Sequence, residues 1–130
     1  MKRSLVIFAI CGGVLLGLVP LSAHHSFEAE YDRNKKVTLK GKVTKVEWQN
    51  PHVYYYVDVP DSAGKVVNWA IEVGAPNGLY RNGWRRDSLK IGDEVTVEAF
   101  LAKAGGSHAN GSSVILSDGR KVFSGQGPAN

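Results

Sequence analysis

The feature that most constrains the fold is a pair of strand-like runs, residues 37–48 and 53–59, separated by the break Gln49-Asn50-Pro51-His52. Apolar residues alternate along both runs, which is typical of strands with one buried face. The apolar positions of the first run change parity midway, which predicts a bulge near Thr44-Lys45 and a bent strand. The proline in the break cannot donate to a strand ladder, so it places a turn there with His52 at the exit of the turn.

The first 23 residues predict a secretory signal peptide. Residues 1–3 include two basic side chains, residues 5–18 are an apolar run, and the segment ends at the small residue Ala23. The apolar run is shorter than the roughly 20 residues that a membrane-spanning helix needs. We therefore expect cleavage after Ala23, a periplasmic location, and no membrane insertion of the mature protein.

Composition limits the mature chain to a small domain without thiol chemistry. Cleavage would remove Cys11, the one cysteine in the sequence, so no disulfide is expected. It would also lower the formal net charge from +4 to +2, because Lys2 and Arg3 leave with the peptide. Residues 24–36 are polar and predict an extended N-terminal arm, with a frayed terminus as the alternative. We expect the folded domain at residues 37–123 and a flexible tail at residues 124–130.

The remaining patterns favour an all-β domain with one short helix. Strands are predicted at residues 66–73, 94–101 and 113–116, the last followed by a hairpin at Asp118-Gly119. A short helix is predicted at residues 76–82, and residues 103–112 read as a mobile glycine-rich loop. This order predicts a five-stranded, OB-fold-like, partly open barrel. A plain five-strand sandwich is the alternative.

The sequence also resembles a family of small exported bacterial proteins, domain of unknown function 6152. The resemblance covers nearly the whole mature chain. It implies a periplasmic single-domain β protein and brings no established activity. The segments that carry it are Ala23-His24-His25-Ser26-Phe27, Trp48-Gln49-Asn50-Pro51-His52, Asn68-Trp69-Ala70-Ile71-Glu72, Gly83-Trp84-Arg85-Arg86-Asp87-Ser88-Leu89 and Asp118-Gly119-Arg120-Lys121.

The four histidines are the candidate metal ligands, because all lie outside the predicted strands. After cleavage, His24 would offer its α-amine and its imidazole as a chelating pair, and His25 or His52 could add a nitrogen. Nitrogen-rich tetragonal sites favour Cu(II), so we name Cu(II) as the candidate ligand of His24, His25 and His52. The alternative is that the terminal pair is solvated, that His52 packs at the barrel rim, and that His108 is a simple loop residue.

A second candidate surface is the outward face of the second and third predicted strands. Tyr54 and Tyr56 lie there and could stack on a ligand, with His108 in a loop at the same rim. Acidic residues accompany the tyrosines and would repel a phosphate backbone, so we expect no nucleic acid partner. An envelope protein or a glycan is the alternative partner to a metal ion, and cross-strand tyrosine packing is the alternative to any binding role.

No catalytic motif is recognisable. The serines have no readable base, and the glutamates are spread over different predicted strands, so we expect no enzymatic activity. The sequence therefore predicts a non-enzymatic periplasmic binding module, with no cofactor implied other than Cu(II).

Overall fold

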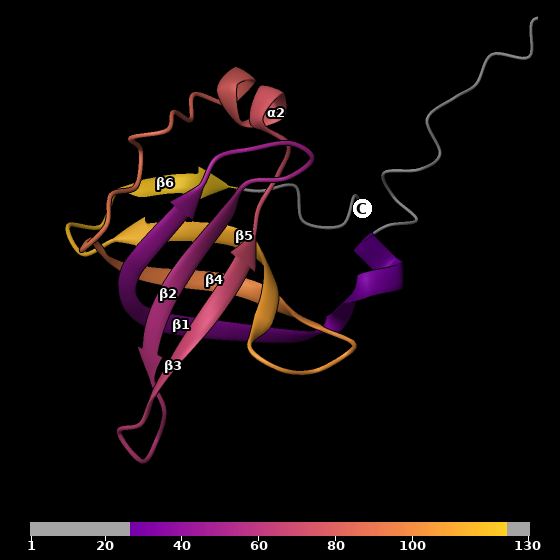
Figure 1. Cartoon of the computed structure of the whole chain (residues 1–130), viewed down its shortest axis with the longest axis vertical. Coiled ribbons are helices and arrows are strands. Elements are labelled where there is room, and N and C mark those ends of the chain that lie inside the picture. Colours follow the sequence, from indigo (N-terminus) through magenta and orange to yellow (C-terminus); the bar gives the residue numbers. More distant parts are fainter. Residues whose placement is uncertain (1–26, 125–130) are drawn as a thin grey trace, which may run out of the picture.

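The computed structural model describes residues 27–124, which form six strands and two short helical segments (Figure 1). The predicted signal peptide, His24, His25 and most of the predicted tail lie outside the described residues. After a helical turn at residues 27–30, the elements are β1 (Tyr31–Glu47), β2 (Tyr54–Pro60), β3 (Val66–Glu72), α2 (Pro76–Arg81), β4 (Glu94–Ala102), β5 (His108–Leu116) and β6 (Lys121–Ser124). Neither helical segment in this part of the chain is long and apolar enough to cross a membrane.

Five of the strands pair in a closed ring, in the order β1, β2, β3, β5, β4 and back to β1. Every pairing in the ring is antiparallel except that of β3 with β5, which is parallel and joins residues 70–72 to residues 108–110. Strand β6 extends the sheet at the other edge of β5. This arrangement confirms the predicted all-β, OB-like fold, with α2 between β3 and β4 as expected, but it has six strands where five were predicted, because residues 121–124 form β6.

Strand β1 is longer and more irregular than the sequence indicated. The predicted bulge is confirmed, because the register with β2 shifts between Val43 and Lys45. The strand begins at Tyr31, six residues before the predicted start, so the expected arm at residues 24–36 is partly strand. The register with β4 is interrupted between Tyr31 and Lys36. This irregular, polar stretch breaks the alternation that would have shown the strand in the sequence.

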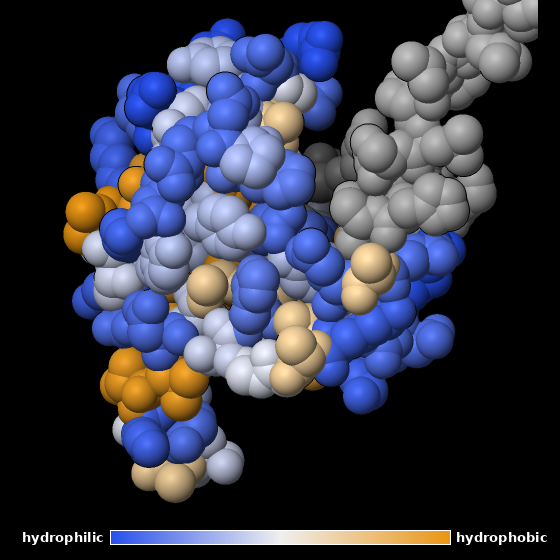
Figure 2. All heavy atoms as spheres, turned by 45° about the vertical axis from the view of Figure 1, so that its right-hand side comes forward, coloured by the Kyte–Doolittle hydropathy of each residue, from blue (hydrophilic) through white to orange (hydrophobic). Residues whose placement is uncertain are grey.

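The core lies inside the ring and includes the residues of β2 and β3 whose alternation places them on the inner face. Val53, Tyr55 and Val57 of the β2 run are at most 1% exposed, and Ile71 of β3 is fully buried. At one end of the ring, Leu79 of α2 is buried and belongs to the same core cluster as Trp84. The face shown in Figure 2 is mostly hydrophilic, with one hydrophobic patch near the end of the β2–β3 hairpin, where Val66 is exposed, and another at the left edge of the view.

The predicted mobile loop at residues 103–112 is wrong in its second half. Strand β5 begins at His108 and includes Asn110 and Gly111, which had read as loop residues. A Cβ atom at Gly111 would lie 2.9 Å from a methyl group of Ile71 and 3.2 Å from one of Val73. The glycine is therefore a point of close approach between β5 and β3, and it does not mark a flexible turn.

Candidate functional site

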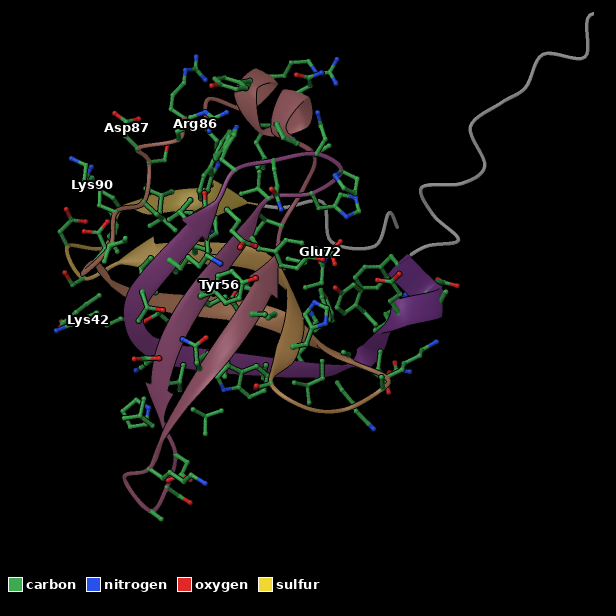
Figure 3. All side chains as sticks on the ribbon, viewed as in Figure 1. Lys42, Tyr56, Glu72, Arg86, Asp87 and Lys90 are labelled. Atoms are coloured by element: carbon green, nitrogen blue, oxygen red, sulfur yellow. The ribbon has the colours of Figure 1, made fainter. Side chains whose placement is uncertain are left out.

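The candidate site is centred on Glu72, the last residue of β3, which is labelled at the end of that strand in Figure 3. Period-two alternation along β3 places this residue on the outward face of the strand, yet its side chain is only 6% exposed. A buried carboxylate is costly unless hydrogen bonds compensate for the lost water. The residues that supply those bonds therefore define the site.

Three side chains contact the two carboxylate oxygens of Glu72. The hydroxyl groups of Tyr31 and Tyr54 both donate to Oε2, the latter at 3.0 Å. On the other oxygen, Nδ1 of His52 lies 2.7 Å from Oε1. His108 completes the group, with its Nε2 3.0 Å from the Tyr31 hydroxyl and 3.9 Å from Oε2. We call Tyr31, His52, Tyr54, Glu72 and His108 the Glu72 cluster.

Strand pairing brings the cluster together from four separate parts of the chain. Tyr54, the first residue of β2, pairs directly with Glu72. His52 is held beside the end of β3 because its neighbour Val53 donates to the carbonyl of Gly74 at 2.8 Å and accepts from the amide of Val73 at 3.0 Å. These backbone bonds fix the loop between β1 and β2 against β3.

His108 and Tyr31 reach the cluster from the first residues of β5 and β1. The Ala70 amide donates to the carbonyl of Ser107 at 3.0 Å, and His108 pairs with Ala70 at the start of the parallel ladder. Tyr31 begins β1 and pairs with Ala102 of β4. The ends of β1, β2, β3 and β5 therefore converge on one carboxylate.

An aromatic layer covers Tyr31 and links it to the helical turn at residues 27–30. The Phe27 ring lies 5.6 Å from the rings of both Tyr31 and Phe100. Phe100 of β4 is itself buried, with 4% of its surface exposed. On the other side, the ring of His108 lies 5.5 Å from that of Tyr31. Tyr31 is therefore enclosed and its hydroxyl is directed at Glu72.

The electrostatics of the cluster keep the tyrosines in their donor form. Burial raises the pKa of Tyr31 far above its ordinary value, and the hydrogen bond to Glu72 and its charge add to the increase. The pKa of Tyr54 is raised for the same reasons, with burial first and the charge of Glu72 second. Both hydroxyls therefore keep their hydrogens and donate them to the carboxylate at all physiological pH values.

The structure brings together some of the residues predicted from the sequence and separates others. His52, Tyr54 and His108 belong to the Glu72 cluster, although His108 begins a strand and does not lie in a loop. Tyr56 lies farther along the sheet in Figure 3, where its hydroxyl donates to Glu47 Oε2 at 2.9 Å. His24 and His25 lie outside the described residues.

Sequence reasoning missed Tyr31 and Glu72 as site residues. Tyr31 lies in the segment predicted as an extended arm, and Glu72 is one of the glutamates spread over different predicted strands. One signal was available in the sequence. Glu72 lies at the end of its predicted strand, and in an OB-like ring the neighbouring strands adjoin loops that carry histidines. Within residues 27–124 no three His, Cys, Asp or Glu side chains converge closely enough to hold a metal ion by themselves.

Comparison with known proteins gives a family and one fold likeness. A family model described as a family of unknown function (DUF6152) matches residues 13–112. No curated protein matches the chain. Among solved structures, the mitochondrial single-stranded DNA binding protein Rim1 from S. cerevisiae is similar, with 18% sequence identity and a TM-score of 0.47 over 63% of this chain and 92% of that one.

The similarity to Rim1 contradicts the exclusion of nucleic acids that was made from the sequence, because Rim1 is a single-stranded DNA binding protein. That exclusion is therefore withdrawn. A TM-score of 0.47 at 18% identity carries no argument about what the present chain itself binds.

Proposed function

Because the chain belongs to the DUF6152 family, a family of unknown function, we propose a function from its own residues: an exported, periplasmic binding module that binds Cu(II) through His24, His25 and His52. The proposal includes cleavage of the signal peptide after Ala23, which creates the N-terminal amine of His24. It assigns no catalytic step to the protein.

The observation that carries the proposal is the contact between His52 and Glu72. An ionised carboxylate only accepts hydrogen bonds, so the Nδ1 atom of His52, 2.7 Å from Oε1, must carry its ring hydrogen. The lone pair of the neutral ring is then on Nε2. Histidines that bind metals usually donate their other ring N–H to a carboxylate or a carbonyl in this way. With 40% of its side chain exposed, His52 has the chemistry of a pre-oriented metal ligand.

The aromatic layer supports the participation of the N-terminal histidines. Phe27, the first described residue, packs on Tyr31, and Tyr31 bonds the same carboxylate as His52. His25 precedes Phe27 by two residues, a span of at most about 7 Å of extended chain. Together with the amine of His24, the set would supply several nitrogen ligands. Such a site binds Cu(II) more tightly than other divalent ions.

Isothermal titration of Cu(II) into the correctly processed protein tests the proposal, after mass spectrometry has established the N-terminus. We expect His24→Ala and His52→Ala each to weaken binding by at least about tenfold, because each removes a direct nitrogen ligand. Asp118→Ala, which removes an exposed carboxylate at the β5–β6 turn, is the control. Equal, weak binding by the processed protein and both histidine variants would contradict the proposed site.

A second candidate function is the docking of an envelope protein or a glycan on the face that carries Tyr54 and Tyr56. Both rings are partly exposed on the outside of β2, and Lys45 lies 5.0 Å from the ring of Tyr56. Both hydroxyls are already bonded to glutamates, which leaves the ring faces as the contact surface. In a pull-down from envelope extract, recovery of the same partners by the Tyr54→Ala/Tyr56→Ala variant would count against this face.

A further inference from the structure

We propose that the outward face of β2 and β3 binds an arginine or lysine side chain of a partner protein at the position of Ala70. The proposal rests on the second candidate function, because it names the chemistry of the partner that docks on the face that carries Tyr54 and Tyr56. It does not involve the proposed copper ligands. We call Ala70 and its neighbours on this face, Tyr56, Asn68, Glu72 and His108, the Ala70 subsite.

Ala70 is the smallest outward side chain among larger neighbours. It pairs with Tyr56 of β2 on one side and with His108 of β5 on the other. Along β3, Asn68 and Glu72 lie on the same face as Ala70, because alternate residues of a strand share a face. The methyl group of Ala70 therefore lies between longer side chains on all four sides, and it cannot cover the rings beside it.

The ring of Tyr56 is open on the side that faces β3. Its hydroxyl donates to Glu47 of β1 at 2.9 Å, so the side chain leans towards β1 and away from Ala70. Nζ of Lys45, also on β1, lies 5.0 Å from the ring centroid. Tyr56 is labelled over the middle of the sheet in Figure 3, and its side chain is partly exposed. The direct neighbour of the ring on β3 is Ala70, which leaves this side of the ring available to a ligand.

Asn68 offers a hydrogen-bond acceptor beside this ring. Its Nδ2 atom donates to Oγ1 of Thr44 at 3.1 Å and to Oδ1 of Asp58 at 2.7 Å. Those two bonds use both hydrogens of the amide, so the Oδ1 atom of Asn68 is the group left for a ligand. Asn68 is exposed, and a ligand can therefore reach this oxygen.

His108 offers a second acceptor on the opposite side of Ala70. The Tyr31 hydroxyl donates its one hydrogen to Glu72, so Nε2 of His108, 3.0 Å from that hydroxyl, must carry a hydrogen. The lone pair of the neutral ring is then on Nδ1. The ring of His108 lies 6.0 Å from that of Tyr54 and 39% of its side chain is exposed. A ligand at Ala70 therefore has to supply hydrogens to both neighbours.

The charges on this face favour a cationic ligand. Lys45 forms an ion pair with Glu47, whereas Asp58 and Glu72 form none with any Lys or Arg in residues 27–124. Ammonium and guanidinium groups carry a positive charge, have only hydrogen-bond donors, and bind the faces of aromatic rings. These three properties match the uncompensated carboxylates, the two acceptors and the open ring of the Ala70 subsite.

One of the protein's own side chains already binds in this way. Lys45 places its ammonium group over the ring of Tyr56 and pairs with the adjacent carboxylate of Glu47. A partner's arginine or lysine would occupy the other side of the same ring. A neutral glycan is the competing ligand. Its hydroxyl groups both donate and accept, so its binding would not depend on charge.

An NMR titration of the ¹⁵N-labelled protein with two short peptides tests the proposal. The peptides are acetyl-Gly-Arg-Gly-amide and its citrulline counterpart, which keeps the shape of the side chain without the charge. We expect the arginine peptide to shift the amide resonances of Ala70, Tyr56 and His108, and the citrulline peptide to bind at least about fivefold more weakly. Added salt should weaken binding of the arginine peptide, because it screens exposed charges.

Variants of the subsite identify the residues responsible. Ala70→Leu should abolish the shifts, because the larger side chain fills the position beside the ring. Tyr56→Leu should weaken binding by about two- to fivefold, the usual contribution of an exposed cation–π contact. The control is Thr38→Leu, which adds the same side chain at an exposed position of β1 that pairs with β4, and it should bind as the wild type does.

Urea unfolding establishes that each variant is folded. Should Ala70→Leu fail to fold, Asn68→Leu decides the matter. It removes the acceptor at an exposed position with little change in size, and it should also weaken binding. Unchanged binding by a folded Ala70→Leu or Asn68→Leu variant would overturn the proposal.

The remaining outcomes separate this proposal from the functions on which it bears. Equal binding of the two peptides, or shifts confined to residues outside the subsite, would overturn it. Binding of spermidine without binding of the arginine peptide would identify a free polyamine as the ligand and overturn the partner protein. A partner recovered from envelope extract through Tyr54 and Tyr56, without any binding of the arginine peptide, would support docking on this face and overturn only the cationic chemistry. The copper titration is unaffected by all of these results.

Discussion

Tyr54 and Tyr55 are neighbours on β2 that face opposite sides of the sheet, and they differ in whether the hydroxyl group has a hydrogen-bond partner. Tyr54 faces outward and donates to Glu72 at 3.0 Å. Tyr55 faces the core, where it is 1% exposed and its ring lies 6.1 Å from that of Trp84. Its hydroxyl is the one buried side-chain polar atom in residues 27–124 without a hydrogen-bond partner.

The difference shows what each face of β2 is organised to do. The inner face gains stability from buried apolar area, and it tolerates an unpaired hydroxyl because the Tyr55 ring fills the core. The outer face buries a carboxylate and surrounds it with donors, although an apolar residue there would avoid the cost of removing a charge from water. Such an arrangement favours a functional role for the Glu72 cluster over a role in stability alone.

The largest expected effect is on the inner face. Tyr55→Ala should lower the free energy of unfolding by about 3–5 kcal/mol, the usual cost of removing a large buried aromatic ring. Its matched control is Tyr56→Ala, the next residue, which is partly exposed on the outer face and should cost much less. Urea unfolding followed by tryptophan fluorescence measures both. Equal losses would mean that the two faces contribute alike to stability.

The next largest effect is expected at Glu72. Glu72→Gln should cost about 1–3 kcal/mol, because one acceptor oxygen cannot serve all three donors and a buried donor is left unpaired. The control is Glu47→Gln, which alters a more exposed tyrosine–glutamate pair, with 26% of the Glu47 side chain accessible. Urea midpoints compare the two variants. A similar loss at both positions would show that burial of Glu72 adds nothing to its contribution.

Alkaline pH should weaken the cluster by a smaller amount. The pKa of Tyr31 is raised by burial and by Glu72, so its folded pKa lies above the unfolded value near 10. A raised pKa stabilises the fold below pH 10, and this contribution is lost as the pH rises towards the folded pKa, by up to about 1.4 kcal/mol per pH unit. Between pH 9 and pH 11, Tyr31→Phe should therefore lose about 1 kcal/mol less stability than the wild type. Identical losses in the two proteins would contradict the raised pKa.

The smallest effects are expected from the two hydroxyl deletions on β2, and they should have opposite signs. Tyr55→Phe removes a buried unpaired hydroxyl and should raise the free energy of unfolding by up to about 1 kcal/mol. Tyr54→Phe removes a bonded hydroxyl and should lower it by about 1 kcal/mol. Thermal unfolding of the two variants side by side gives the sign directly. Stabilisation by both would mean that the bond from Tyr54 to Glu72 contributes nothing.

Most of the fold could be predicted because its signals are local. The alternation along residues 53–59 gave the inward face of β2, and the parity change near Thr44 gave the bulge in β1. The start of β5 was missed because the sequence around Gly111 looks like a loop, while the glycine is required by the side chains of β3 that pack against it. That requirement comes from a distant part of the chain, so no local pattern shows it.

The sequence by itself determined the order of the elements and the positions of His52 and Tyr54 at the ends of the β1–β2 loop and the β2 strand. Only the tertiary structure decided that Glu72 is buried and that Tyr31, His52 and His108 surround it. Period-two alternation places Glu72 on the outside of β3, and this is correct for the strand taken alone. The ends of β1 and β5 then cover that outside surface, through pairings between residues far apart in the sequence, and turn an exposed carboxylate into the centre of the site.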